Sequence, residues 1–268
     1  MTAIPCWQID AFTQVPFSGN PAAICWIDCD APIEWMQAVA NEMNLSETAF
    51  VRRQADDYSL RWFTPEVEVS LCGHATLASA HALWTADLHS RKEPIRFHTQ
   101  SGVLTCRLTD ETIEMDFPSK PSLNAEPPEG LLEALGLESV VEVRKNGMDH
   151  LIVVNRAETV RSLKPDFGKL KSIPTRGTIV TSESDDDSYD FVSRFFAPAV
   201  GIDEDPVTGS AHCCLGPYWA AELGKRELVA LQASRRKGVV QVRVADNRVI
   251  LGGQAVTVWR GELEAVPC

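Results

Sequence analysis

The chain has 268 residues, of which 44% are hydrophobic and 23% charged, and its net charge is -12. A chain of this length and balance folds as one large globular domain or as two of ordinary size. The acidic charge argues against nucleic acid and anionic membrane surfaces as main partners. No apolar run reaches the ~18 residues that span a bilayer, and the start of the chain has no signal-peptide pattern. We therefore expect a cytoplasmic protein.

Short strands separated by turn signals dominate the first half of the chain. The strands predicted there are 4–12, 22–27, 48–53, 58–63, 103–108 and 112–117. Helices are predicted at 32–43 and 73–85. Turn signals such as "TDET" and "ADNR" favour antiparallel hairpins over a doubly wound parallel sheet.

The segment 117–130, "FPSKPSLNAEPPEG", contains four prolines and few apolar residues, which is typical of a linker. It divides the chain into an expected domain 1–117 and a second domain 118–268, whose last strand is free to pack back on the first. The strands predicted after it are 140–145, 150–155, 177–182, 189–196, 238–244, 248–252 and 255–260. The predicted helices are 128–135, 166–171 and 209–223.

The two halves resemble one another. "RWFTP" at 61–65 precedes Gly73, and "RFFAP" at 194–198 precedes Gly209. Each glycine begins a run with helical spacing, so we infer an internal duplication. Two such helix starts facing one cleft offer free N–H groups that bind a carboxylate or an enolate-like oxygen.

Glu47, in "NLSETAFV", allows two interpretations. Asn44 and Glu47 match a capping box, which would only stabilise a helix start. The following residues favour a strand, however. A carboxyl group at a strand edge between Ser46 and Thr48 can be partly desolvated, which brings its pKa toward the value that proton transfer requires.

Asp205 and His74 are the other candidates. Asp205, in "DEDPVTGSAH", either serves the dipole of the next helix, or it orients a substrate group or shares a proton. His74 lies at a helix start, where the dipole is expected to lower its pKa. His81 and His212 complete no metal-binding spacing with His74 and a nearby carboxylate, so we expect no metal site.

The eight cysteines include no CxxC pair, which favours reduced thiols. Most are expected to be small buried side chains, with Cys213 and Cys214 packed inside a helix. Cys72, directly before Gly73, is the exception that invites a chemical role.

Four words along the chain together carry a family resemblance. They are "DAFTQVPFSGNPAAIC" (10–25), "NLSETAFV" (44–51), "RWFTPEVEVSLCGHATLASA" (61–80) and "DEDPVTGSAH" (203–212). On these words the chain resembles the phenazine-biosynthesis PhzF-like family, whose fold is shared with diaminopimelate epimerase. The resemblance covers essentially the whole chain.

The resemblance implies an α+β fold of two similar domains, each a curved, mostly antiparallel sheet around a central helix, with the active site between them. It also implies cofactor-independent proton transfer at carbon and a homodimer. The proton carrier of the family matches Glu47, and the histidine and aspartate match His74 and Asp205. The residues expected to bind a small carboxylate substrate are Ser46, Gly73, Gly209 and Ser210.

The best-understood member of the family isomerises a dihydro-hydroxyanthranilate, which suits one carboxyl group acting as base and then as acid. We therefore expect an isomerase. Epimerases of this fold use two opposed cysteines; Cys72 matches the first, whereas Pro206 or Val207 occupies the place expected for the second. A racemase that uses Cys72 opposite Glu47 or Asp205 stays open, as does a carboxylate-binding protein without turnover.

Overall fold

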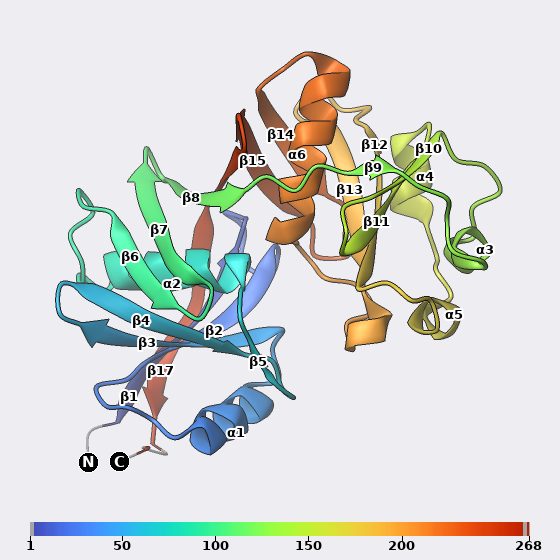
Figure 1. Cartoon of the computed structure of the whole chain (residues 1–268). Coiled ribbons are helices and arrows are strands. Elements are labelled where there is room, and N and C mark those ends of the chain that lie inside the picture. The colour runs from blue at the N-terminus through green and yellow to red at the C-terminus, as the bar shows by residue number, and fades with distance from the viewer. Residues whose placement is uncertain (1–2, 265–266, 268) are drawn as a thin grey trace. The chain divides into compact units, whose positions relative to one another are not determined.

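The computed structural model describes residues 3–264 and 267, and the chain divides into two compact units (Figure 1). The first unit comprises Met1–Asp116 with Gly252–Cys268, and the second comprises Phe117–Leu251. The division after residue 116 falls where the proline-rich segment begins. Residues from 252 onward group with the first unit, because the last strand pairs with the first strand of the chain.

The first unit is built on one sheet in the order β17-β1-β2-β3-β4-β6-β7-β8. The pairs β2–β3 and β4–β6 are parallel, and the other pairs in this order are antiparallel. Its strands are β1 (Ile4–Ala11), β2 (Asn20–Trp26), β3 (Glu47–Gln54), β4 (Asp57–Phe63), β5 (Glu68–Val69), β6 (Ile95–Thr99), β7 (Gly102–Thr109), β8 (Thr112–Pro118) and β17 (Ala255–Leu263). Its helices are α1 (Ile33–Met43) and α2 (Gly73–Thr85).

Helix α2 forms the centre of the first unit. Its sequence, "GHATLASAHALWT", is rich in alanine and apolar around its circumference, as expected of a helix covered on every side. The buried residues include the run from His74 to Ala80, and the helix contacts β1, β2, β3 and β17. The sheet therefore wraps around α2, and the small side chains allow the strands to approach closely.

The second unit repeats this plan. The pairs β10–β11, β12–β13 and β14–β15 are antiparallel, whereas β11–β12 and β13–β14 are parallel. Its strands are β9 (Leu123–Asn124), β10 (Glu142–Lys145), β11 (Asp149–Val153), β12 (Gly177–Glu183), β13 (Phe191–Phe196), β14 (Glu227–Gln232), β15 (Gly238–Ala245) and β16 (Arg248–Gly253), the last of which continues into the first unit. Its helices are α3 (Leu131–Leu135), α4 (Ala157–Ser162), α5 (Phe167–Lys171), the short 3-10 turn η1 (Pro198–Val200) and the central α6 (Gly209–Leu223).

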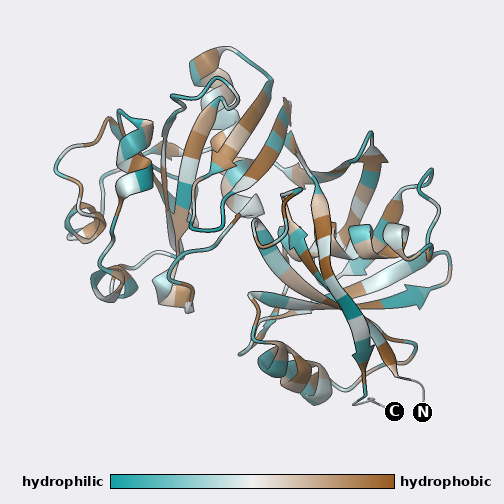
Figure 2. Ribbon diagram, turned by 180° about the vertical axis from the view of Figure 1, so that it is seen from behind, coloured by the Kyte–Doolittle hydropathy of each residue, from teal (hydrophilic) through white to brown (hydrophobic). Residues whose placement is uncertain are grey.

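The alternation of antiparallel and parallel pairs is the same in both units, which supports the internal duplication. Hydrophobic segments, brown in Figure 2, recur along the strands of each unit and supply the layer that packs on its central helix. The predicted α+β fold of two similar halves is confirmed, down to α2 and α6, whose observed bounds equal the predicted ones.

The duplication sets which residues correspond. Thr48 pairs with Phe63 in the first unit, and Thr178 pairs with Phe196 in the second. Because Phe63 and Phe196 end the matching words "RWF" and "RFF", Thr48 corresponds to Thr178. The residue before each threonine then corresponds as well, so Gly177 occupies the position of Glu47.

Two further observations concern membrane-spanning helices and the cysteines. Among the described residues, no helix combines the length and apolarity needed to cross a membrane. Cys29 is disulfide-bonded, so the expectation of reduced thiols is wrong at this position. The free cysteines of the described residues are Cys6, Cys25, Cys72, Cys106, Cys213 and Cys214, all of them buried.

Candidate active site

Glu47 begins strand β3 rather than a helix. The capping-box interpretation is wrong, because Asn44 ends helix α1 in the left-handed conformation with a φ of 49°. The turn Leu45–Ser46 then leads directly into the strand. Glu47 therefore stands at the strand start, with its side chain 13% exposed.

His74 lies beside this carboxyl group. Its Nε2 is 3.1 Å from Glu47 Oε2, and its side chain is 7% exposed. On the other side of the ring, the Asn20 amide nitrogen is 3.1 Å and the Cys72 sulfur 3.6 Å from Nδ1. The starts of β2, β3 and α2 thus bring a carboxyl, an amide, an imidazole and a thiol together in the first unit.

The charges of this cluster decide how His74 titrates. Burial lowers its pKa, but the contacts with Cys72 and Glu47 raise it by more, so the net pKa lies well above the ordinary histidine value. The expectation that the helix start lowers this pKa is therefore wrong. Burial raises the pKa of Cys72, and the nearby charge of Glu47 adds to this rise. Cys72 is therefore a neutral thiol at neutral pH.

Glu47 and His74 are consequently a pair that can hold and exchange a proton. An amide carries both a donor and an acceptor, so Asn20 can contact Nδ1 in either protonation state of His74. Among the described residues, Glu47 Oε2 has no aligned hydrogen-bond donor, although it is buried. A buried acceptor of this kind is available to a proton that arrives from a bound molecule.

Asp205 lies in the second unit, in the turn that leads into α6. Its Oδ2 accepts a hydrogen bond from the Thr208 hydroxyl at 2.6 Å. Gln232 holds both ends of the turn: its amide donates to the Asp205 carbonyl and its oxygen accepts from the Thr208 N–H. The Ser234 hydroxyl donates to the Pro206 carbonyl. The turn is therefore fixed from the end of β14.

Ser210, the second residue of α6, is held from another side. Arg176 pairs with the carboxylate of Asp149, which is 1% exposed, and donates to the Ser210 hydroxyl oxygen at 3.1 Å. With that oxygen occupied as an acceptor, the Ser210 hydroxyl hydrogen and the N–H groups at the start of α6 remain as donors. Gly209 begins this helix, as predicted.

The second unit has no counterpart of the acid or of the thiol. At the Glu47 position, Gly177 packs so closely that a Cβ there would lie 2.3 Å from the Phe195 ring. At the position of Cys72, which is the N-cap of α2, the N-cap of α6 is Thr208. This corrects the expectation that Pro206 or Val207 occupies that place.

The predicted residues therefore fall into two groups. Glu47 and His74 meet in the first unit, where Ser46 and Gly73 adjoin them in sequence. Asp205, Gly209 and Ser210 belong to the second unit. That both groups serve one substrate stays a prediction.

The sequence interpretation did not single out several polar side chains that hold these groups in place. These are Asn20, Asp149, Arg176, Gln232 and Ser234. The signal for Asn20 is a polar residue at the start of the apolar strand "NPAAICW".

His212, inside α6, leads to a prediction about pH. Burial lowers its pKa to about 4, although its Nδ1–H donates to the Thr208 carbonyl at 2.8 Å. Because this folded-state pKa lies below the unfolded value, the stability it contributes is complete above about pH 6.5 and is lost as the pH falls through about 4, a loss on the order of 3 kcal/mol.

We expect His212→Asn to show a smaller fall in the free energy of unfolding between neutral and acid pH, measured with urea at each pH. His81, whose pKa is also about 4, leaves part of the fall in place. An unchanged pH profile would contradict this prediction.

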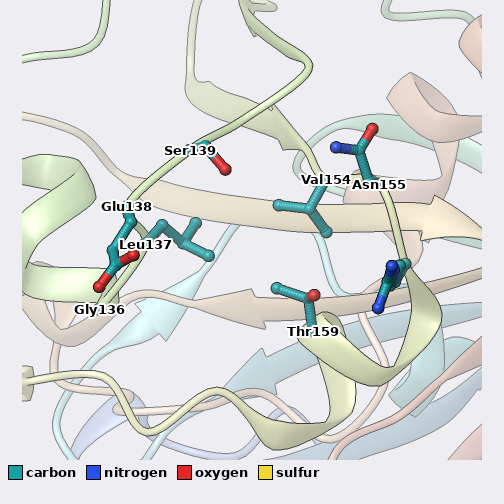
Figure 3. A pocket seen from close by; sticks show the side chains of 8 residues that line it. Gly136, Leu137, Glu138, Ser139, Val154, Asn155 and Thr159 are labelled. Carbon is teal, nitrogen blue, oxygen red and sulfur yellow. The ribbon is translucent and has the colours of Figure 1, made fainter.

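A cavity of about 430 Å³ lies in the second unit, away from these groups in sequence. Its lining includes Leu137, Ser139, Val154 and Thr159 (Figure 3). None of the predicted site residues lines it, and it contains no cluster of acids, histidines or cysteines. The cavity is therefore not the candidate active site.

A solved structure of low sequence identity shares the fold. A hydroxyproline epimerase from Agrobacterium vitis matches with a TM-score of 0.58, covering 97% of this chain and 92% of that one. The two sequences are 9% identical, so the likeness is one of fold alone.

The family is defined by closer matches. The family model described as phenazine biosynthesis-like protein, PhzC-PhzF, matches residues 9–261. An uncharacterized isomerase from Halalkalibacterium halodurans is 52% identical over 264 residues, 98% of this chain and 99% of that protein. A PhzF family protein from Enterococcus faecalis has a crystal structure with a TM-score of 0.94 and 41% identity, covering 98% and 100% of the two chains. The chain belongs to the PhzC-PhzF family of isomerase-type proteins.

Proposed function

We propose that this protein is a cofactor-independent isomerase that moves a proton at carbon in a small carboxylate substrate. The observation that carries the proposal is the contact between Glu47 and His74, 3.1 Å apart and largely shielded from water. Glu47 takes a proton from carbon, and His74 shares it until Glu47 returns it. General acid–base catalysis by such a positioned pair contributes about 10²–10⁴-fold to a rate.

The surroundings of the pair support one proton carrier rather than two opposed bases. Cys72 is the nearest alternative base, but burial raises the pKa of its thiol. Its counterpart in the second unit, Thr208, has a hydroxyl that donates to Asp205. A two-thiol racemase of this fold would need a second cysteine at that position.

The substrate contacts proposed for the second unit rest on donors at the start of α6. Ser210 and the N–H groups there suit a carboxylate or an enolate-like oxygen. Asp205 orients a substrate group rather than acting as a second base. A homodimer and a cytoplasmic location also stay predictions.

The proposal is tested by solvent exchange. The full chain is incubated in D₂O with a dihydro-hydroxyanthranilate and a panel of small carboxylates that carry an acidic C–H bond, and deuterium at carbon is followed by NMR. We expect deuterium to enter at least one of these compounds. Compounds that bind in a thermal-shift assay without exchange would instead identify a carboxylate-binding protein.

Cys72→Ser separates the isomerase from a racemase that uses this thiol. Because Cys72 stays protonated in the proposed mechanism, we expect the serine variant to retain deuterium incorporation within about tenfold of wild type. Cys106→Ser, at a buried cysteine outside the cluster, is the matched control for packing effects. Loss of exchange in Cys72→Ser alone would favour the racemase.

A further inference from the structure

The duplication relates Arg176 of the second unit to the acid–histidine pair of the first. Gly177 corresponds to Glu47, and Arg176 directly precedes Gly177 in the chain. Ser210 is the second residue of α6, just as His74 is the second residue of α2. The first unit therefore brings a carboxyl group and an imidazole together at this place, whereas the second brings a guanidinium and a hydroxyl together, 3.1 Å apart.

The guanidinium of Arg176 is fixed along one edge. Its Nε donates to Asp149 Oδ1 at 2.7 Å, and its Nη2 pairs with Oδ2 of the same carboxylate. The Asp149 side chain is 1% exposed, so water does not compete for this contact. One face of the guanidinium lies over the ring of Phe195, 5.4 Å from its centroid. The two contacts together hold the Arg176 side chain in one orientation.

The other edge of the guanidinium is available to a ligand. The contacts with Asp149 and Ser210 use Nε and Nη2, and within the part of the chain that the structure describes Nη1 has no hydrogen-bond partner. The Arg176 side chain is 31% exposed, so a dissolved anion can reach it. The Ser210 oxygen accepts from Arg176, which leaves the hydroxyl hydrogen free to donate elsewhere. The two neighbouring donors suit the two oxygens of one carboxylate.

We propose that Arg176 and Ser210 form a carboxylate-binding site, in which Nη1 and the hydroxyl each donate to one carboxylate oxygen. Asp149 is the positioning residue that holds the guanidinium. Since Asp149 also neutralises the charge of Arg176, the site recognises the arrangement of two acceptor oxygens more than negative charge alone. That the carboxylate belongs to the substrate rests on the proposed function, whereas the binding of a carboxylate does not.

Acetate tests this site without knowledge of the substrate. Full-length protein labelled with ¹⁵N-arginine is titrated with acetate, or with the neutral analogue acetamide, at constant ionic strength, and the guanidinium resonances are followed by NMR. Arg61 is the internal control, because it pairs with Glu68 through the same two nitrogens and is 30% exposed, but among the described residues no hydroxyl accepts from it. We expect acetate alone to cause a saturable shift at Arg176 and none at Arg61.

Arg176→Lys tests the role of the site in the reaction. Lysine keeps the positive charge beside Asp149, but it lacks the planar fork that contacts several acceptors at once. With a compound that exchanges deuterium, we expect KM to rise about 10–100-fold, the effect of losing a hydrogen bond to a charged group. The contact is the same before and during proton transfer, so kcat should change little. Arg61→Lys, the same change in the control pair, is expected to keep both constants.

The carboxylate site is overturned if acetate shifts the resonances of Arg176 and Arg61 alike, or shifts neither. A wild-type KM in Arg176→Lys also overturns it. The titration uses wild-type protein, so it decides the matter even where the lysine variant does not fold. Acetate binding at Arg176 without deuterium exchange in any compound supports the site and removes the isomerase. Exchange by a protein that binds no acetate at Arg176 removes the site and leaves the isomerase.

Discussion

Replacing Glu47 by glutamine is expected to lower the rate of proton transfer by about 10²–10⁴-fold. The amide has the shape of the carboxyl group, but it cannot carry the proton. Glu47 is also the charge within 3.1 Å of Nε2 that helps to raise the pKa of His74. The variant should therefore lower that pKa, which an NMR titration of the histidine measures independently of any substrate.

The measurement is the rate of deuterium incorporation from D₂O, together with the thermal midpoint of unfolding. Glu42→Gln, at an exposed residue near the end of α1, is the control for loss of a single negative charge. We expect the control to keep the wild-type rate and both variants to keep the wild-type fold. Wild-type exchange by Glu47→Gln would refute the assignment of Glu47 as the proton carrier.

The sequence predicted the fold and the central pair because their signals are local. The alanine-rich run after Gly73 has helical spacing over its whole length, so both ends of α2 were predictable. Glu47 and His74 were singled out from separate words, and their contact depends on where β3 and α2 begin. The capping-box prediction at Asn44 was wrong because asparagine is favoured both as a helix N-cap and as the left-handed residue that ends a helix. Here Asn44 ends α1.

Other features depend on contacts that no local pattern contains. Residues 227–232, "ELVALQ", are good helix formers, yet they form β14 because β13 and β15 pair with them on both sides. Arg176 precedes β12 in an unremarkable turn, and only the fold brings it to Asp149 and Ser210. Side chains that hold a site in place were found only in the structure, because their partners lie far away in the sequence.

Arg194→Ala is expected to destabilise the second unit by about 3–5 kcal/mol, which lowers its unfolding temperature by roughly 10 °C. The Arg194 side chain is 9% exposed and binds Glu204 through Nε at 2.7 Å and Nη2 at 3.0 Å. Its Nη1 also donates to the backbone carbonyls of Val160 and Leu163. Truncation leaves a carboxylate and two carbonyl groups without this donor in a largely buried place, and that loss, rather than the ion pair itself, determines the cost.

The duplication supplies the matched control, since Arg61 occupies the same position in the first unit. It binds Glu68 with the same two-pronged geometry, at 2.7 and 2.8 Å, but its side chain is 30% exposed, so water can replace the lost donor. We expect Arg61→Ala to cost only about 1 kcal/mol. Scanning calorimetry and urea unfolding of both variants measure the difference. Equal losses for the two arginines would show that the exposed fraction does not set the cost of removing this contact, and that the shared strand position does.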